Sequence, residues 1–406
     1  MTSGKLAKLI ADTQKARALI VDLFQKAVVN IPDQYKGWGQ WLDDPKSLQY
    51  GIYGSSAGVQ ILHLGGIDKD HEVMKGAMAF IEKGCLEPKG KIFDKGDITV
   101  NFKLAFIVDA TRVFEREIDS ECQTMQKLVD RQLPGEGWGN YVEGDNNDTS
   151  SRVPVTAYVL WALRRYRRFI GMSSSDEAVS WLASQVINND DLDLSEVGLA
   201  GIALGEYSRS RANDYNRSRE KCVERLIEFS KHSSPSQFGI SKFMNYYTTS
   251  VGGNPGNRYV FFLPHCLAAL ALMKLGSAAS ARKYISDVVR FFSQEVNSKK
   301  GFGPPNSGRL STVDHLWIYR LFLEFESTAA QLVSGFSLKV VGLKPWQRHT
   351  LTAALFLMAL PATYIAYAQR TLEEGSLVVV IIAGALAALL LSLCARCVWE
   401  FYFKGE

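Results

Sequence analysis

The stretch KGFGPPNSGRLSTVDHLWIYRL, from Lys300 to Leu321, passes from a glycine-aromatic-glycine turn through a polar segment into an apolar helix. A similar turn precedes an apolar helix at three other places: KGWGQW from Lys36, GEGWGNY from Gly135 and SQFGIS from Ser236. Glycine allows a tight turn and a close backbone approach, and the aromatic ring can stack against a neighbouring helix. We therefore interpret these turns as structural rather than catalytic.

Apolar residues recur at helical spacing almost throughout the chain before Ser337, with no convincing alternating strand. Six apolar helices are predicted, beginning at Tyr50, Ile98, Ser151, Leu194, Asn257 and Arg309. An amphipathic helix with a charged face alternates with each of them, and the first of these lies at the N-terminus, which lacks the apolar core of a signal peptide. A period of roughly 40 to 65 residues is typical of repeat architectures.

This pattern predicts an all-α fold. Helices that are apolar all round are expected to be buried and amphipathic helices to cover them. Six of each can close into an (α/α)6 toroid over residues 1–336, with the buried helices lining a central cavity. An open solenoid is the alternative. We favour closure because the first and last repeats lack an obvious polar cap.

The C-terminal part differs in kind, because it contains two uncharged apolar runs, Leu351–Ala368 and Leu377–Ala395. Each approaches the roughly 20 residues that span a bilayer. After a linker at 337–349 they predict a transmembrane helical hairpin at 350–398, followed by a tail at 399–406. A buried-core hairpin is the alternative.

Basic residues flank the hairpin at Lys339, Lys344, Arg348, Arg396 and Lys404. By the positive-inside rule the toroid and both termini are expected to be cytoplasmic, in a multi-pass membrane protein whose partner is the lipid bilayer. Gly384 and Ala388 form a small-xxx-small face that could pack against the first span or form a homo-oligomer through the hairpin.

Composition limits the other functions. The net charge of +4 and the absence of dense basic runs argue against a nucleic-acid partner. The six cysteines do not resemble a secreted disulfide framework and indicate reduced thiols. Neither a phosphate-cradling glycine loop nor a nucleophile elbow is present in the sequence.

The turns GWGQW, GWGNY and GFGPP, each leading into an apolar helix, resemble the repeats of the terpenoid cyclase and protein prenyltransferase superfamily. The resemblance covers about Leu6 to Phe325. It implies an α/α barrel around a cavity for an isoprenoid or other apolar ligand. Fold alone does not settle the activity.

The resemblance also implies a zinc site. Protein prenyltransferases hold zinc with an Asp-x-Cys pair at the mouth of one inner helix and a His at the mouth of the next. Cys266 and His315 match the cysteine and the histidine, Pro264 stands in place of the aspartate, and His265 or Asp314 could substitute for it. The alternative is that Asp314 is a helix-start acid and His315 a half-buried structural residue.

The terpenoid cyclase resemblance implies a catalytic acid. Squalene-hopene cyclases protonate their substrate with the middle acid of an Asp-x-Asp-Asp motif. Asp191 and Asp193 match the first two acids, and Leu194 replaces the last. The alternative, which is the commoner use of such acids, is that they cap a helix.

Aromatic residues near the starts of the apolar helices could line the cavity and stabilise cations. Those predicted to do so are Tyr53, Phe102, Tyr158, Trp161, Tyr259 and Trp317. The alternative is that they are ordinary core residues.

Two functions of different classes follow. The first is a membrane-anchored toroid that binds an isoprenoid or other apolar ligand, with a prenyltransferase-like or terpene cyclase-like activity whose motifs are incomplete. The second is a non-catalytic sensor or effector toroid that signals to a membrane-perturbing hairpin, as in bacterial antiviral defence or stress response.

Overall fold

The computed structural model describes residues 3–39, 41–43, 52–86, 101–111, 124–139, 150–164, 173–207, 212–240, 242–251, 254–303 and 309–334. The chain divides into two units, Met1–Gly335 and Phe336–Glu406, and all described residues belong to the first. The predicted membrane hairpin, its linker and the tail lie outside the described residues. Among the helices in the ranges above, none is both long and apolar enough to cross a membrane.

The predicted, mostly helical fold is confirmed, with twelve described α-helices. The apolar set is α2 (Ile52–Leu64), α4 (Asn101–Thr111), α6 (Val153–Leu163), α9 (Leu194–Tyr207), α11 (Pro264–Lys274) and α13 (Thr312–Ser334). The amphipathic set is α1 (Ser3–Lys26), α3 (Glu72–Leu86), α5 (Thr124–Asp130), α8 (Ser173–Asn188), α10 (Ala212–Lys231) and α12 (Arg282–Lys299). The two sets alternate along the chain, as the sequence predicts.

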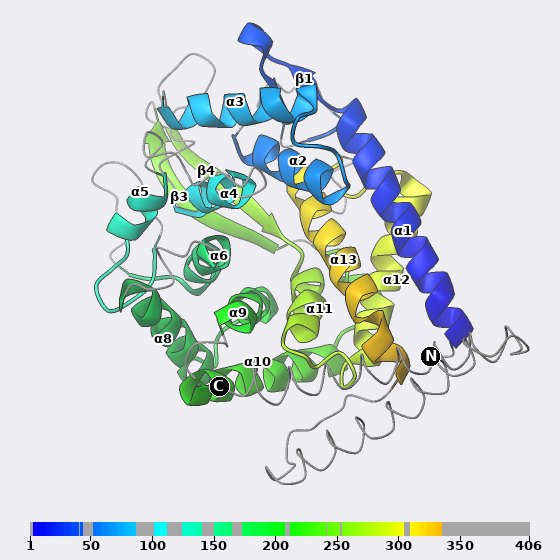
Figure 1. The fold of residues 1–406 in the computed structure, drawn as a ribbon. Helices are drawn as coiled ribbons and strands as arrows, with labels where there is room; N and C mark the ends of the chain where they lie inside the picture. The colour runs from blue at the N-terminus through cyan, green and yellow to red at the C-terminus, as the bar shows by residue number, and fades with distance from the viewer. Residues whose placement is uncertain are drawn as a thin grey trace, which may run out of the picture. The chain divides into compact units, whose positions relative to one another are not determined.

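The apolar helices pack against one another. Each contacts the next apolar helix along the chain, and α13 also contacts α2. The amphipathic helices lie around this group, with α1 against α2, α12 and α13, and α8 and α10 against α9 (Figure 1). All residues of α6 from Val153 to Leu163 are buried, which explains why its sequence is apolar all round.

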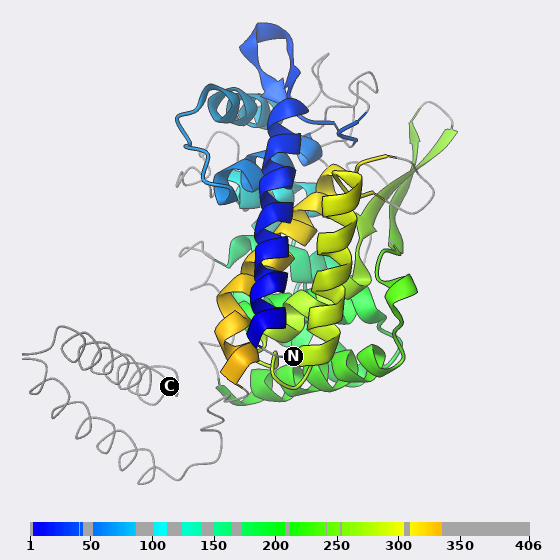
Figure 2. The same cartoon turned by 90° about the vertical axis from the view of Figure 1, so that its right-hand side faces the viewer.

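Two strands depart from the prediction. β3 (Lys242–Val251) and β4 (Asn254–Phe262) form an antiparallel hairpin, seen in yellow-green in Figure 2. The expected helix from Asn257 begins only at Pro264, so the predictions of a helix start at Asn257 and of no strand are wrong here. Proline suits the first helical turn and disfavours a helical residue before it, while the aromatic and β-branched residues of both strands favour extended backbone.

The remaining strands and the 3-10 helices are short. β1 (Val29–Asn30) pairs with β2 (Lys36–Gly37), which is the beginning of the first turn. The 3-10 helix η1 (Pro32–Gln34) precedes the first turn, and η3 (Pro235–Gln237) overlaps the beginning of the third.

The turn aromatics are held by backbone hydrogen bonds. The Trp38 indole donates to the Phe24 carbonyl of α1 at 2.8 Å, and the Trp138 indole donates to the Leu128 carbonyl of α5 at 2.6 Å. Both rings are fully buried. Each turn is therefore tied to the amphipathic helix before it, as a structural role predicts.

The backbone N–H of Trp38 and that of Trp138 are each bonded to the following apolar helix. Trp38 donates to Ser55 Oγ at 3.2 Å and Trp138 to Thr156 Oγ1 at 2.8 Å, and both acceptors are the fourth residue of their helix. A Cβ on Gly137 would lie 2.2 Å from Thr156 Oγ1, so this bond needs glycine before the aromatic.

Bonds between repeats follow a second pattern. At the start of α4 the Asn101 side chain donates to the Gly139 carbonyl of the next turn at 2.9 Å. At the start of α13 the Thr312 hydroxyl donates to the Gly39 carbonyl of the first turn at 2.6 Å. The last described repeat therefore makes the same kind of contact with the first repeat as α4 makes with its successor.

Candidate functional site

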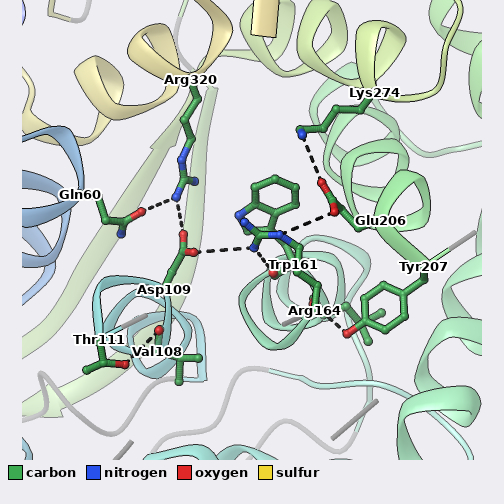
Figure 3. A network of polar contacts seen from close by, with 11 residues as sticks. Gln60, Val108, Asp109, Thr111, Trp161, Arg164, Glu206, Tyr207, Lys274 and Arg320 are labelled. Atoms are coloured by element: carbon green, nitrogen blue, oxygen red, sulfur yellow. Dashed lines mark hydrogen bonds and ion pairs between the residues drawn. The ribbon is translucent and has the colours of Figure 1, made fainter. Parts of the chain in front are cut away.

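Charged and polar side chains from α2, α4, α9, α11 and α13 meet with Arg164, which directly follows α6 (Figure 3). They come from the later part of α2, α4, α9 and α11 and from the first half and middle of α13. We call this group the polar cluster, and its members are Gln60, Asp109, Arg164, Glu206, Lys274, Arg320 and Glu324. Burying charge is costly unless the charges are paired, so such a group in an otherwise apolar interior marks a candidate site.

Asp109 lies at the centre of the polar cluster. Arg320 Nη2 donates to Asp109 Oδ2 and also to Gln60 Oε1, and Arg164 Nη1 lies 3.7 Å from Asp109 Oδ1. Asp109 is fully buried and both arginines are less than a tenth exposed. Burial lowers the pKa of Arg320, but attraction to Asp109 outweighs it, so the net shift is upward and the guanidinium stays charged.

The outer part of the polar cluster is partly exposed. Lys274 lies between Glu206 and Glu324, 3.1 Å from a carboxylate oxygen of each. Glu206 Oε2 is also 4.0 Å from Arg164 Nε. The side chains of these two glutamates are 32% and 24% exposed, so the cluster extends from solvent to the buried Asp109.

The Trp161 ring lies among the three cations of the polar cluster. The Arg164 guanidinium is 3.3 Å, the Lys274 ammonium 4.9 Å and the Arg320 guanidinium 5.7 Å from its centroid. Arg320 also lies 5.2 Å from the Trp317 ring centroid. Cation–π attraction favours this arrangement when the cations are shielded from water.

Several buried donors around Arg320 make no hydrogen bond of normal geometry. These atoms are Arg320 Nη1, Gln60 Nε2, Tyr158 Oη, Trp161 Nε1 and Trp317 Nε1. The Tyr158 hydroxyl interacts with the Arg320 charge, but burial is the larger influence and raises its pKa, so the phenol keeps its proton. Each buried donor without an acceptor costs about 1 to 3 kcal/mol. Several buried donors in and beside the polar cluster thus make no hydrogen bond of normal geometry within the described part of the chain.

Most of the aromatic residues predicted to line a cavity contact one another. Ring centroids are 4.2 Å apart between Tyr53 and Phe106, 4.5 Å between Phe102 and Tyr158, and 5.9 Å between Tyr158 and Trp317. The structure thus brings Tyr53, Phe102, Tyr158 and Trp317 together, and places Trp161 in the polar cluster. Tyr259 lies on β4 opposite Asn245, and its side chain is outside the described part.

His315, a predicted zinc ligand, uses both ring nitrogens to hold the fourth turn. Nδ1 donates to the Ser311 carbonyl at 2.5 Å and Nε2 accepts from the Phe302 N–H at 2.9 Å. His315 is the fourth residue of α13, the position that Ser55 and Thr156 occupy in their helices. Burial lowers its pKa to about 4, which keeps the imidazole neutral.

The other predicted zinc ligands do not complete a site around His315. His265 Nδ1 lies 2.9 Å from the Tyr284 hydroxyl, and burial lowers the pKa of His265 to about 4. Cys266 is fully buried, and burial together with Asp314 raises its thiol pKa, so it is a poor ligand. Within the described ranges no three His, Cys, Asp or Glu side chains are placed to hold a metal ion. The zinc site stays a prediction.

Asp314 is buried without normal hydrogen bonds to its carboxylate. It is 0% exposed, and neither oxygen has a partner of normal geometry. Burial raises its pKa to about 7, and the nearby Ser311 hydroxyl offsets part of this shift. Asp314 is thus placed to be protonated near neutral pH.

The predicted catalytic acids lie at the start of α9. Asp193 Oδ1 accepts from the backbone N–H groups of Ser195 at 2.8 Å and Glu196 at 3.1 Å, while Glu196 Oε2 accepts from the Asp193 N–H at 3.0 Å. This is a capping box, the commoner use of an acid at that place. Asp191 is exposed, with its N–H bonded to Asn189 Oδ1 at 3.1 Å.

Asp109, Arg164 and Arg320 are not among the site residues that the sequence predicts. Asp109 and Arg320 each stand within an apolar run, FKLAFIVDAT and HLWIYRLF, and this is a signal because a charge in a buried helix needs a partner. Arg320 pairs with Asp109 across 211 residues of sequence. Reading each helix separately cannot reveal such a pair.

Comparison with known proteins gives no relatives: no protein-family model matches this chain, and no curated protein shows significant similarity to it.

Proposed function

We propose that the described helices form the closed (α/α)6 toroid of the predicted type. The contact between α13 and α2 supports closure, since an open solenoid would keep its first and last repeats apart. The bond from Thr312 to Gly39 supports it further, because the bond from Asn101 to Gly139 is its counterpart within the chain.

Within this toroid we propose a non-catalytic sensor that binds a ligand at the polar cluster. The main support is the composition of the polar cluster, to which all six apolar helices or the residue directly after them contribute. Buried donors in and beside the cluster make no hydrogen bond of normal geometry. The residues on which the proposed chemistry would depend are occupied elsewhere, because His315 holds a turn and Asp193 caps a helix. A ligand is a better explanation of the cluster than a reaction is.

The proposed output is an effect on the bilayer through the predicted hairpin at 350–398. α13 carries Arg320 and Glu324 and is the last described helix before that segment. A ligand that binds two arrangements of α13 unequally would shift the population between them. This gives a ligand in the toroid a covalent path to the membrane segment, as in an effector of bacterial antiviral defence or stress response.

A membrane-permeability assay tests this function. The full chain, a chain ending at residue 336, and the Asp193→Ala and His315→Gln variants are produced in bacteria, and uptake of a membrane-impermeant dye is measured after induction. We expect dye uptake with the full chain and with both substitutions, provided that they accumulate normally, and none with the shortened chain. Absence of dye uptake with the full chain, or its loss in a folded Asp193→Ala variant, would overturn the proposal.

The alternative is an isoprenoid enzyme, favoured by the aromatic contacts among Tyr53, Phe102, Tyr158 and Trp317. Incubating the purified full chain with an isoprenoid diphosphate and analysing products by mass spectrometry tests it. Turnover by the native chain that is lost in the Asp193→Ala variant would establish the enzyme in place of the sensor.

A further inference from the structure

The buried donors without a hydrogen bond of normal geometry belong to Arg320 itself and to residues near it, some inside the polar cluster and some beside it. Arg320 Nη1 is itself one of them, and the Trp161 and Trp317 ring centroids lie 5.7 and 5.2 Å from its guanidinium. Tyr158 interacts electrostatically with Arg320, and its ring is 5.9 Å from that of Trp317. Because Gln60 is bonded to Arg320 through Oε1, its free Nε2 lies in the same place.

The charges of the polar cluster are unevenly distributed. At the buried end, the guanidiniums of Arg164 and Arg320 both lie beside the carboxylate of Asp109, and Arg164 is also 4.0 Å from Glu206. At the exposed end, Lys274 lies between the carboxylates of Glu206 and Glu324. The three cations and three carboxylates balance over the polar cluster as a whole, but Asp109 is the one fully buried carboxylate among them, next to donors that lack acceptors.

We propose that this buried end binds a small ligand through an oxyanion group, a carboxylate or a phosphate, which accepts hydrogen bonds from Arg320 Nη1, Tyr158 Oη and Trp161 Nε1. The inference rests on the proposed ligand-binding function and names the chemistry of its ligand. An apolar ligand would leave the same donors unsatisfied at a cost for each. An oxyanion supplies several acceptor lone pairs and one negative charge, and guanidinium groups bind such anions well.

Two tyrosines provide a matched pair of variants. Tyr158 is fully buried and its hydroxyl makes no hydrogen bond of normal geometry, whereas the buried Tyr207 donates its hydroxyl to the Leu160 carbonyl at 3.1 Å. Tyr158→Phe therefore removes a hydroxyl that lies beside Arg320 and makes no hydrogen bond of normal geometry within the described part of the chain. Tyr207→Phe removes a donor that the fold uses.

The experiment measures thermal unfolding of the purified full chain in detergent. Inorganic phosphate and acetate are titrated separately, with chloride at matched ionic strength as the reference. We expect a saturable rise in melting temperature with at least one of the two, and the one that acts identifies the group as phosphate or carboxylate. In Tyr158→Phe the half-saturating concentration should rise about tenfold, as expected for one lost hydrogen bond to a charged group.

Tyr207→Phe is the control variant, and we expect it to change stability and leave anion binding unchanged. Tyr207→Phe should melt at a lower temperature with or without the anion and keep the native half-saturating concentration. Without anion, Tyr158→Phe should melt at or above the native temperature, because a donor without an acceptor is removed. Trp161→Phe, which keeps a ring and removes Nε1, is the second test of the same site and should also weaken anion binding.

Three results would overturn the inference: no saturable effect of either anion, equal anion dependence in Tyr158→Phe and the native chain, or a fall in melting temperature of anion-free Tyr158→Phe as large as that of Tyr207→Phe. The last result would mean that water already satisfies the hydroxyl. Dye uptake without anion binding would overturn this inference alone. Anion binding without dye uptake would overturn the membrane output alone.

Discussion

At the N-terminal ends of the apolar helices, polar side chains bond to the backbone of a neighbouring turn, whereas in the polar cluster, farther along these helices, they bond to one another across the domain. Ser55, Thr156 and His315 each accept the N–H of a turn aromatic, although they are three different residue types. In the polar cluster no such equivalence exists, since Asp109 and Arg320 are 211 residues apart in the sequence and meet only in three dimensions.

The difference between these two sets of polar residues indicates which of them are candidates for function. A polar residue that recurs at the same place in successive repeats is explained by the repeat, even when it is a histidine. A charged residue that breaks the apolar character of one helix has no such explanation. The four predictions below test this distinction, beginning with the largest expected effect.

Removing the central charge should be the most damaging change. Asp109→Asn leaves two buried guanidiniums without their carboxylate, and breaking a buried ion pair in this way costs about 3 to 5 kcal/mol. Urea unfolding of the full chain in detergent measures the loss. Glu326→Gln is the matched control, because its partner Arg17 is partly exposed and the expected loss is about 1 kcal/mol or less. Equal losses of unfolding free energy in the two variants would show that the Asp109 ion pairs contribute no more to stability than the partly exposed pair.

Asp314→Asn should change how stability depends on pH. The folded-state pKa of about 7 lies above the ordinary value of 3.8, so the folded chain retains a proton that the unfolded chain loses between these values. This group's contribution to stability therefore falls as pH rises from about 4 to 7, by up to about 1.4 kcal/mol per pH unit.

The measurement for Asp314 is the difference between the native chain and the variant in the free energy of unfolding at pH 5, 6, 7 and 8. Asp314→Asn should become progressively more stable relative to the native chain up to pH 7 and then stay level. Subtraction cancels the histidines, His265 and His315, whose lowered pKa values act in the opposite direction. A difference that does not vary with pH would show that Asp314 stays ionised.

His315→Ala should cost about 2 kcal/mol, because the Phe302 N–H and the Ser311 carbonyl both lose their side-chain partner. Thermal unfolding is measured with added zinc and with a chelator. We expect the same loss in both, since the role is to hold a turn. If zinc raises the melting temperature of the native chain but not that of His315→Ala, the result would support a zinc site at His315.

Asp193→Ala should have the smallest effect, about 1 kcal/mol, because it removes a helix N-cap. Asp191→Ala is its control and should change stability by less than about 0.5 kcal/mol, since an exposed side chain is replaced. Urea unfolding distinguishes the two. Equal effects would argue against the capping role of Asp193.

Much of the helical pattern could be predicted, because each apolar helix carries its own run of apolar residues and four of the six follow a glycine-aromatic turn. The β3–β4 hairpin could not, since its aromatic residues continued the apolar pattern up to Pro264 and strand pairing requires a partner segment. The alternative uses of His315 and Asp193 were also foreseeable as helix-start residues, although only the structure identifies the groups that they bond to.

The sequence by itself determined the alternation of six apolar with six amphipathic helices and the turns between them, because hydrophobic spacing and glycine conformations act over a few residues. Only the tertiary structure decided which polar atoms are satisfied. A buried polar atom without a hydrogen-bond partner costs free energy, so its partners matter for stability. The partners of a buried charge, such as Arg320 and Asp109, come from helices that are neighbours in space and distant in sequence.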